Sequence, residues 1–370
     1  ERPASNLVFL IDVSGSMAEP GKLPLLQDAF ALLLAGLDAR DRVTVVTYAG
    51  DAGVALPTTA GDQREAIRRA IDRLRAEGGT NGAGGIRVAY DAARRSLIPQ
   101  GNNRVILATD GDFNVGVSDT GELVRLVQDG ARAGIHLTVL GVGRTDLKDA
   151  RLERLADQGD GQYHYLDGID EARRVFAERL TGTLHTIARD VKVQVEFNPA
   201  RIAGWRLIGY RNRQLAASDF LRTGVDAGEI GAGHVVTALY ELIPIGVAVP
   251  AELPPDPFVR TGEPAAAAMD GAAVAPGDAA VLRLRLAYQP PAGGTQTTSE
   301  FDIVDPGRSW QAASPDFRFA AAVAAVAERL LGASAPSWPE IARWARESAG
   351  ADAQRQEFLR LIDRAAELRP

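Results

Sequence analysis

The first half of the chain alternates between short apolar runs and longer segments whose apolar residues recur at helical spacing. The apolar runs are typical of strands buried in a sheet. The runs are residues 7–11, 42–48, 104–109, 135–140 and 162–166, and the helical segments are residues 22–37, 62–75, 86–97, 120–133, 150–156 and 170–187. This alternation predicts an α/β domain with a mostly parallel sheet.

Single residues predict some of the boundaries in this domain. We expect residues 54–56 to form a short antiparallel edge strand that Pro57 stops, because proline cannot donate to a sheet ladder. Asp62 is expected to cap the helix that follows it. The glycine-rich segment 78–85 is expected to form the loop before helix 86–97.

The second half has a different pattern, in which apolar and polar residues alternate as in half-exposed strands. These strands are expected at residues 191–197, 205–210, 234–240, 281–288 and 300–304, followed by helices at 317–331, 338–348 and 353–368. Residues 250–276 are rich in Pro, Ala and Gly and are expected to form a mobile loop. We therefore predict an antiparallel β sandwich over residues 189–312 and terminal helices over 313–370, after an α/β domain over 1–188.

Composition excludes several classes of protein. The net charge of −7 provides no basic stripe for nucleic acid. The absence of cysteine excludes disulfides, thiolate metal sites and cysteine nucleophiles. No apolar run approaches the roughly 20 residues that span a membrane. The chain begins at Glu1 without a signal peptide, so we expect a mature form or a fragment whose N-terminal anchor, if any, lies upstream.

A polar cluster follows the first strand. Asp12, Ser14 and Ser16 lie at alternate positions, so their side chains point into one crevice if the turn stays extended. Hard oxygen donors without Cys or His suit Mg²⁺ first, and Mn²⁺ or Ca²⁺ next. An alternative interpretation is that these residues only cap the following helix.

Two more oxygen residues extend this pattern. Thr80 lies in the glycine-rich segment, and Asp110 directly follows strand 104–109. The five residues together resemble the metal-ion-dependent adhesion site of the von Willebrand factor type A family, which has Asp-x-Ser-x-Ser after the first strand, a Thr in a later loop and an Asp after the fourth strand. The resemblance implies a Rossmann-like, doubly wound domain. It also implies that Ser14, Ser16 and, in one conformation, Thr80 bind the metal directly, while Asp12 and Asp110 hold metal-bound waters.

The predicted function follows from this resemblance and from the charge of the site. Two carboxylates leave a bound divalent cation close to neutral, so an open position can accept a carboxylate from another protein. We expect a non-enzymatic, metal-dependent interaction or adhesion module with an acidic protein partner, no small-molecule substrate and no catalytic residue. An accessory subunit of a chelatase-type ATPase stays open, because it would share the metal site, as does a metal that only stabilises the loops.

Details of the loop stay open. The glycine pairs around Thr80 either let it switch between direct and water-mediated coordination or simply form turns. Asp112 is either a partner behind Asp110 or a solvated turn residue, and we favour the turn. The role of Asn81 is undecided.

Three segments extend the resemblance to nearly the whole chain. Residues 2–8, 103–116 and 226–234 resemble the bacterial YfbK-like group, in which a type A domain precedes a C-terminal extension of unknown function. Members are usually exported or lipid-anchored envelope proteins with an additional N-terminal region. The resemblance therefore implies a cell-envelope location, with any membrane association through an anchor outside this sequence. A cytoplasmic location stays open.

Enzyme classes fit less well. An aspartyl phosphatase needs a second acid two residues after its nucleophile, where this chain has Ser14. The residues around Ser14 are not Gly-x-Ser-x-Gly, and the glycine-rich segment lacks the Gly-Lys-Ser/Thr of a P-loop. The four histidines are isolated in the sequence, so structural roles are expected for them.

Overall fold

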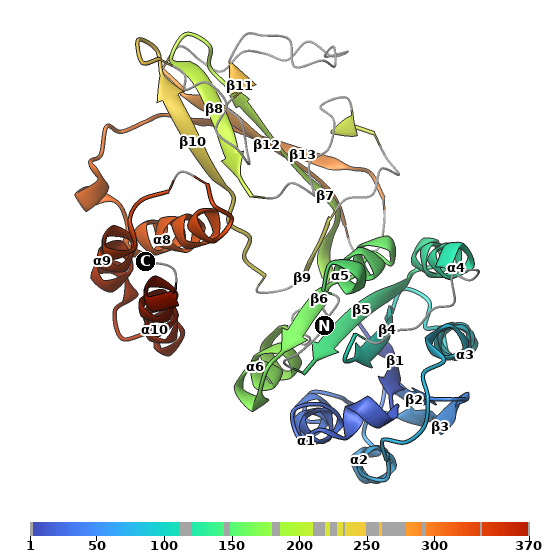
Figure 1. The fold of residues 1–370 in the computed structure, drawn as a ribbon. Helices are drawn as coiled ribbons and strands as arrows, with labels where there is room; N and C mark the ends of the chain where they lie inside the picture. Colours follow the sequence, from blue (N-terminus) through green and yellow to red (C-terminus); the bar gives the residue numbers. More distant parts are fainter. Residues whose placement is uncertain are drawn as a thin grey trace. The chain divides into compact units, whose positions relative to one another are not determined.

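The structure is a computed structural model of the 370-residue chain, in which two compact units can be distinguished (Figure 1). Unit 1 comprises Glu1–Val191, Asp226–His234 and Gln289–Thr295, and unit 2 comprises Lys192–Val225, Val235–Tyr288 and Gln296–Pro370. The structure describes residues 3–111, 120–143, 149–179, 186–209, 219–222, 228–231, 234–248, 259–260, 279–290, 294–333 and 335–368.

Unit 1 is built on a six-stranded sheet. Its strands are β1 (Ser5–Asp12), β2 (Arg42–Tyr48), β3 (Ala52–Ala60), β4 (Asn102–Thr109), β5 (Ile135–Val142) and β6 (Tyr163–Leu166). They lie in the order β3-β2-β1-β4-β5-β6, and every neighbouring pair is parallel except β2 and β3. The predicted mostly parallel α/β sheet is confirmed.

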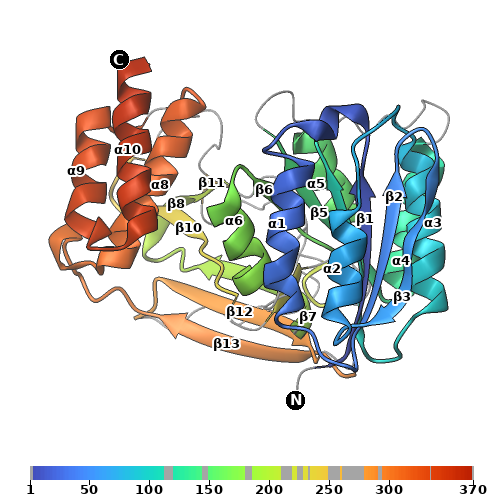
Figure 2. The ribbon, with the colours of Figure 1, turned by 90° about the horizontal axis from the view of Figure 1, so that it is seen from below.

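Helices cover both faces of this sheet (Figure 2). One face carries α1 (Leu23–Leu34), α2 (Arg64–Asp72) and α6 (Ile169–Arg173), and the other carries α3 (Gly82–Arg95), α4 (Thr120–Arg132) and α5 (Asp149–Gln158). The alternation of side chains along β1 explains this arrangement, because Leu7 and Phe9 pack into one apolar core while Val8 and Leu10 pack into the other. Burial of both faces accounts for the continuous apolar runs in the sequence.

The order of the strands fixes where a ligand can bind. The chain runs from β1 outward to β2 and β3, then crosses back to β4, which pairs with the other side of β1. The strand order therefore reverses between β1 and β4, and in sheets of this kind ligands bind beyond the carboxyl ends of the strands at such a point. Asp12 ends β1 and Asp110 directly follows β4.

The prediction that Pro57 stops the edge strand is wrong. β3 continues through Pro57 to Ala60. The register between β2 and β3 shifts between the pair Val45–Leu56 and the pair Val43–Thr59, so Pro57 lies in an irregularity of the ladder, where its missing N–H is tolerated. The prediction of an antiparallel edge strand is confirmed.

The starts of two helices also differ from the prediction. α2 begins at Arg64 with Gln63, not Asp62, at its N-cap. α3 begins at Gly82, so half of the expected glycine loop is helical, and the Asn81 side chain accepts a hydrogen bond from Gly84 N–H at 3.1 Å.

The predicted helix 170–187 is shorter than expected. α6 gives way to a π-helical turn at Arg174–Arg179, and the strand β7 (Thr186–Phe197) already includes Thr186 and Ile187. Two β-branched residues at this point favour the extended strand over a continued helix.

The second half of the chain contains, among its described residues, antiparallel strands followed by helices. Besides β7, the strands are β8 (Ile202–Ile208), β9 (Gly228–Gly231), β10 (Leu239–Pro244), β11 (Val259–Arg260), β12 (Leu282–Gln289) and β13 (Thr297–Ile303). They form a three-stranded sheet, β10-β8-β11, and a four-stranded sheet, β13-β12-β7-β9. The helices α8 (Pro315–Leu330), α9 (Trp338–Ala349) and α10 (Ala353–Leu368) share one apolar cluster. The predicted antiparallel β segment and terminal helices are confirmed.

One predicted strand begins later in the chain than expected. Residues 234–238 have no regular structure, and β10 begins only at Leu239. Val235 is 84% exposed, so alternating apolar residues here do not mark a buried face. The predicted loop 250–276 lies outside the described residues except for β11. No helix among the described residues is long and apolar enough to cross a membrane.

Candidate metal centre

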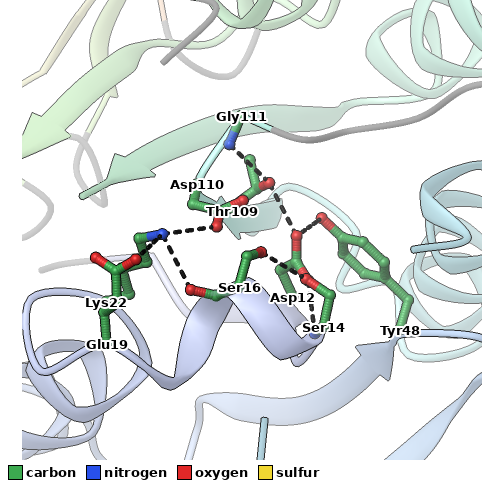
Figure 3. A network of polar contacts seen from close by, with 9 residues as sticks. All are labelled: Asp12, Ser14, Ser16, Glu19, Lys22, Tyr48, Thr109, Asp110 and Gly111. Atoms are coloured by element: carbon green, nitrogen blue, oxygen red, sulfur yellow. Dashed lines mark hydrogen bonds and ion pairs between the residues drawn. The ribbon is translucent and has the colours of Figure 1, made fainter. Parts of the chain in front are cut away.

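Asp12 is the innermost residue of the candidate site. Its carboxylate is fully buried at the end of β1 and accepts three hydrogen bonds (Figure 3). Oδ1 accepts from Ser14 N–H at 2.9 Å, and Oδ2 accepts from the hydroxyl groups of Tyr48 at 3.0 Å and Thr109 at 3.1 Å. Burial raises the pKa of the Asp12 carboxyl, against the opposing effect of the bonds from Ser14 and Tyr48.

Tyr48 and Thr109 reach Asp12 because of the sheet register. Tyr48 is the parallel partner of Asp12 on β2, and Thr109 follows the β4 residue that pairs with Ile11. Burial and the negative charge of Asp12 raise the pKa of Tyr48 well above its ordinary value, so its hydroxyl stays a donor. The sequence analysis missed both residues, although each is the last residue of a predicted strand.

The two serines form the front of the site. Ser14 is buried and Ser16 is exposed, at the start of a short 3₁₀ helix, η1 (Gly15–Ala18). Their Oγ atoms lie 3.2 Å apart. Neighbouring ligands of an octahedral Mg²⁺ lie about 3 Å apart when each metal–oxygen distance is about 2.1 Å. The serine pair therefore has a spacing that fits a small hard cation.

Asp110 lies on the far side of the serines and is paired with a lysine. Lys22 Nζ donates to Asp110 Oδ2 at 3.1 Å and to the backbone oxygen of Ser16 at 3.0 Å, and it lies 3.2 Å from Glu19 Oε1. Burial lowers the pKa of Lys22, but its bonds to Asp110 and Glu19 outweigh this effect and leave the pKa raised. The sequence analysis placed Lys22 only at the start of a helix, although it lies six residues after Ser16.

Thr80 lies on a segment that is held next to the serines by its backbone. Gly15 N–H donates to Gly78 O at 3.1 Å, and Asn81 N–H donates to Ala49 O at 2.5 Å. Thr80, between these two anchors, is half-buried. The structure thus brings this segment beside the turn that carries Ser14, while Asp112 lies outside the described residues.

The donor set fits a divalent cation held partly through water. A carboxylate has about four lone-pair positions, and three donors of the protein use those of Asp12. Room therefore remains for about one more donor, such as a metal-bound water. Among the described residues, no group of three or more His, Asp or Glu side chains gathers around a potential ion position, so a site here would rest mainly on hydroxyl oxygens.

Comparison with known proteins identifies the two parts of the chain. The family model of the von Willebrand factor type A domain matches residues 7–112, and that of the C-terminal region of the uncharacterized protein YfbK matches residues 182–368. The chain belongs to the YfbK family. The uncharacterized YfbK protein of Escherichia coli (strain K12) is 41% identical over 98% of this chain and 62% of its own length.

The chain is also similar to other proteins at lower identity. The inter-alpha-trypsin inhibitor heavy chain H4 of Sus scrofa is 31% identical over 42% of this chain and 17% of its own length. A solved structure, von Willebrand factor type A from Catenulispora acidiphila, has a TM-score of 0.51 at 19% identity, covering 88% of this chain and 74% of that one. This similarity supports the fold alone. This chain spans only part of the length of these relatives, and in the case of the Escherichia coli protein it spans 62%.

Proposed function

We propose that this YfbK-family chain is a non-enzymatic docking module whose type A site binds Mg²⁺, or Mn²⁺ or Ca²⁺, and through it the acidic side chain of a partner protein. Type A domains commonly mediate protein–protein interactions and often bind a metal at this position. The observation that carries the proposal is the Ser14–Ser16 hydroxyl pair, 3.2 Å apart in front of the buried Asp12.

The proposed roles of the five residues are those that the resemblance to type A domains implies. Ser14, Ser16 and Thr80 would hold the cation directly, and Asp12 and Asp110 would hold its waters. Asp12 already accepts three hydrogen bonds and lies deepest, which suits an orienting role better than direct ligation. When bound, the cation supplies a Lewis-acidic position that can accept a carboxylate oxygen.

The domain division is part of the proposal. Residues 1–188 would carry the docking site, and residues 189–370 would form the extension, with a β sandwich over 189–312 and helices over 313–370. A location in the cell envelope is likewise proposed, and fractionation of cells tests it. Recovery in the cytoplasm would favour the role of accessory subunit of an ATPase.

The metal site is tested by calorimetric titration of the metal-stripped protein with Mg²⁺, Mn²⁺ and Ca²⁺. We expect about one equivalent to bind, and we expect Asp12→Ala and Ser14→Ala to lose binding, because each removes an oxygen group from the first or second coordination shell. Ser337→Ala is a matched control, since this exposed serine makes no side-chain cap bond. No binding by the unaltered protein would contradict the proposal.

The docking role needs a second experiment. The immobilised protein should retain a partner from a cell-envelope extract in the presence of Mg²⁺ and release it when a chelator is added. Ser14→Ala should not retain it. If Ser14→Ala lowers the melting temperature but retains the same partner, the metal stabilises the loops and does not take part in docking.

A further inference from the structure

We propose that Lys22 is a tethered positive charge that weakens binding of the divalent cation and strengthens binding of an anionic group to the loaded site. This inference rests on the proposed function, because it concerns the same site. Lys22 is the residue before α1, and its ammonium group lies beside Asp110 (Figure 3). A divalent cation bound at this site would also interact with the negative charge of Asp110.

The ammonium group of Lys22 is held in place on all sides. It has three N–H donors, and three oxygens lie within bonding distance, on Ser16, Glu19 and Asp110. Its side chain is only 6% exposed. A lysine buried and saturated in this way is a fixed component of the site and not a mobile surface charge.

The neighbouring strand leaves space for the lysine side chain. Gly143 follows β5 with φ +100°, and a Cβ atom on it would lie 2.9 Å from Lys22 Cε. The stem of Lys22 therefore passes directly against the backbone at Gly143. This close approach is a second indication that the position of Lys22 is built into the fold.

The charges explain the expected effect. Asp12 and Asp110 alone would give the empty site a charge of about −2 and the loaded site a charge near zero. With Lys22 these values become about −1 and +1. Glu19 is 65% exposed, so water screens its charge much more than that of the buried residues. Lys22 therefore repels the incoming cation and leaves the loaded site positive, as an acidic ligand requires.

The first test compares Mn²⁺ binding by the unaltered protein, Lys22→Met and Lys22→Gln, measured by calorimetry. We expect both neutral variants to bind Mn²⁺ about tenfold more tightly, because a buried like charge near the ion is removed. Arg132→Met removes an exposed charge from the same unit and should leave the dissociation constant unchanged. Melting temperatures show whether each variant is folded.

The opposite result would identify a positioning role. If Lys22 acts mainly by orienting Ser16 and Asp110, Lys22→Met will bind Mn²⁺ more weakly, and Lys22→Gln, which can still donate a hydrogen bond, will recover part of the affinity. That result, or equal affinity in all three proteins, overturns the inference while the proposed metal site stands. If none of the proteins binds Mn²⁺, the proposed function falls as well.

The second test measures the anionic ligand directly. Acetate displaces water from protein-bound Mn²⁺, and the relaxation rate of water protons reports that displacement. At saturating Mn²⁺ we expect acetate to bind several-fold more weakly to Lys22→Met than to the unaltered protein, because the loaded site loses a positive charge. Equal or tighter acetate binding by the variant would overturn this half of the inference.

Discussion

The Asp12 carboxylate is buried at the end of a central strand and bonded to three neutral donors, a backbone amide and two hydroxyl groups. Burial of a carboxylate costs free energy, which is why the pKa of Asp12 is raised. A divalent cation in front of Ser14 and Ser16 would offset this cost. At the residue scale, Asp12 is therefore a buried negative charge that the proposed cation would compensate.

Burial also disfavours the charged form of His136, which is the protonated imidazolium. Burial, with the nearby charges of Arg104 and Arg189, lowers the pKa of His136 from its ordinary value of about 6.5 to about 3. The folded protein therefore takes up this proton less readily than the unfolded chain. The free energy of unfolding therefore keeps its full value above about pH 6.5, where His136 is neutral in both states. It decreases as the pH falls toward about 3, because the unfolded chain binds the proton first.

Between pH 7 and pH 5 the unaltered protein should lose about 2 kcal/mol of stability through His136, because pH 5 lies about 1.5 units below the pKa of the unfolded histidine. We expect His136→Gln to remove this loss. The measurement is the free energy of unfolding by denaturant at both pH values. His234→Gln is the control, since His234 is an exposed histidine. An unaltered slope in His136→Gln would contradict the assignment.

Close packing of helices onto the sheet decides the role of several glycines. In α3, a Cβ atom on Gly85 would lie 2.9 Å from the side chain of Tyr48, the same tyrosine that donates to Asp12. Gly85 therefore allows α3 to approach Tyr48 closely. The second half of the glycine-rich segment 78–85 belongs to this helix and is not a loop. At this scale the function of a glycine depends on what lies opposite, which the chain order does not reveal.

α4 provides a matched pair of glycines for a test. A Cβ atom on Gly130 would lie 2.1 Å from the ring of Tyr90, whereas one on Gly121 would meet only the end of the Arg125 side chain at 3.9 Å. We expect Gly130→Ala to destabilise unit 1 by about 2 kcal/mol through overpacking. Gly121→Ala should stabilise it by about 0.5 kcal/mol through helix propensity. Denaturant unfolding measures both, and equal effects of the two variants would refute the packing argument.

The chain as a whole contains two compact units with separate apolar cores. In unit 2, β8 is joined to α8 by an ion pair between Arg206 and Glu328, 2.6 Å long with both residues buried. Arg206 also pairs with Glu241 at 2.6 Å, so loss of Glu328 leaves the buried guanidinium one carboxylate partner and costs less than the roughly 3–5 kcal/mol of a fully unpaired buried charge. Chains with two cores often unfold in more than one step.

Scanning calorimetry can therefore assign unfolding transitions to the two units. We expect Mg²⁺ at about a hundred times its dissociation constant to stabilise unit 1 by about 2.7 kcal/mol and to raise only its transition. Glu328→Gln should instead lower the transition of unit 2. If Mg²⁺ and Glu328→Gln shift one common transition, the two units unfold together and the expectation is wrong.

The sequence by itself determined the α/β sheet, the antiparallel segment and the terminal helices, because apolar periodicity records which faces are buried. It also placed Asp12 and Asp110 at the carboxyl ends of two strands, and a parallel sheet brings such ends to one edge. The assignment of the five residues as metal ligands stays a prediction.

Only the tertiary structure decided which other residues meet at the site. Tyr48 reaches Asp12 through strand register, and Lys22 reaches Asp110 from 88 residues away in the chain. Local patterns do not contain such contacts, because they depend on how separate elements pack. The same reason explains Pro57, whose effect depended on an irregularity in the ladder with β2, and Gly85, whose role depended on the ring of Tyr48.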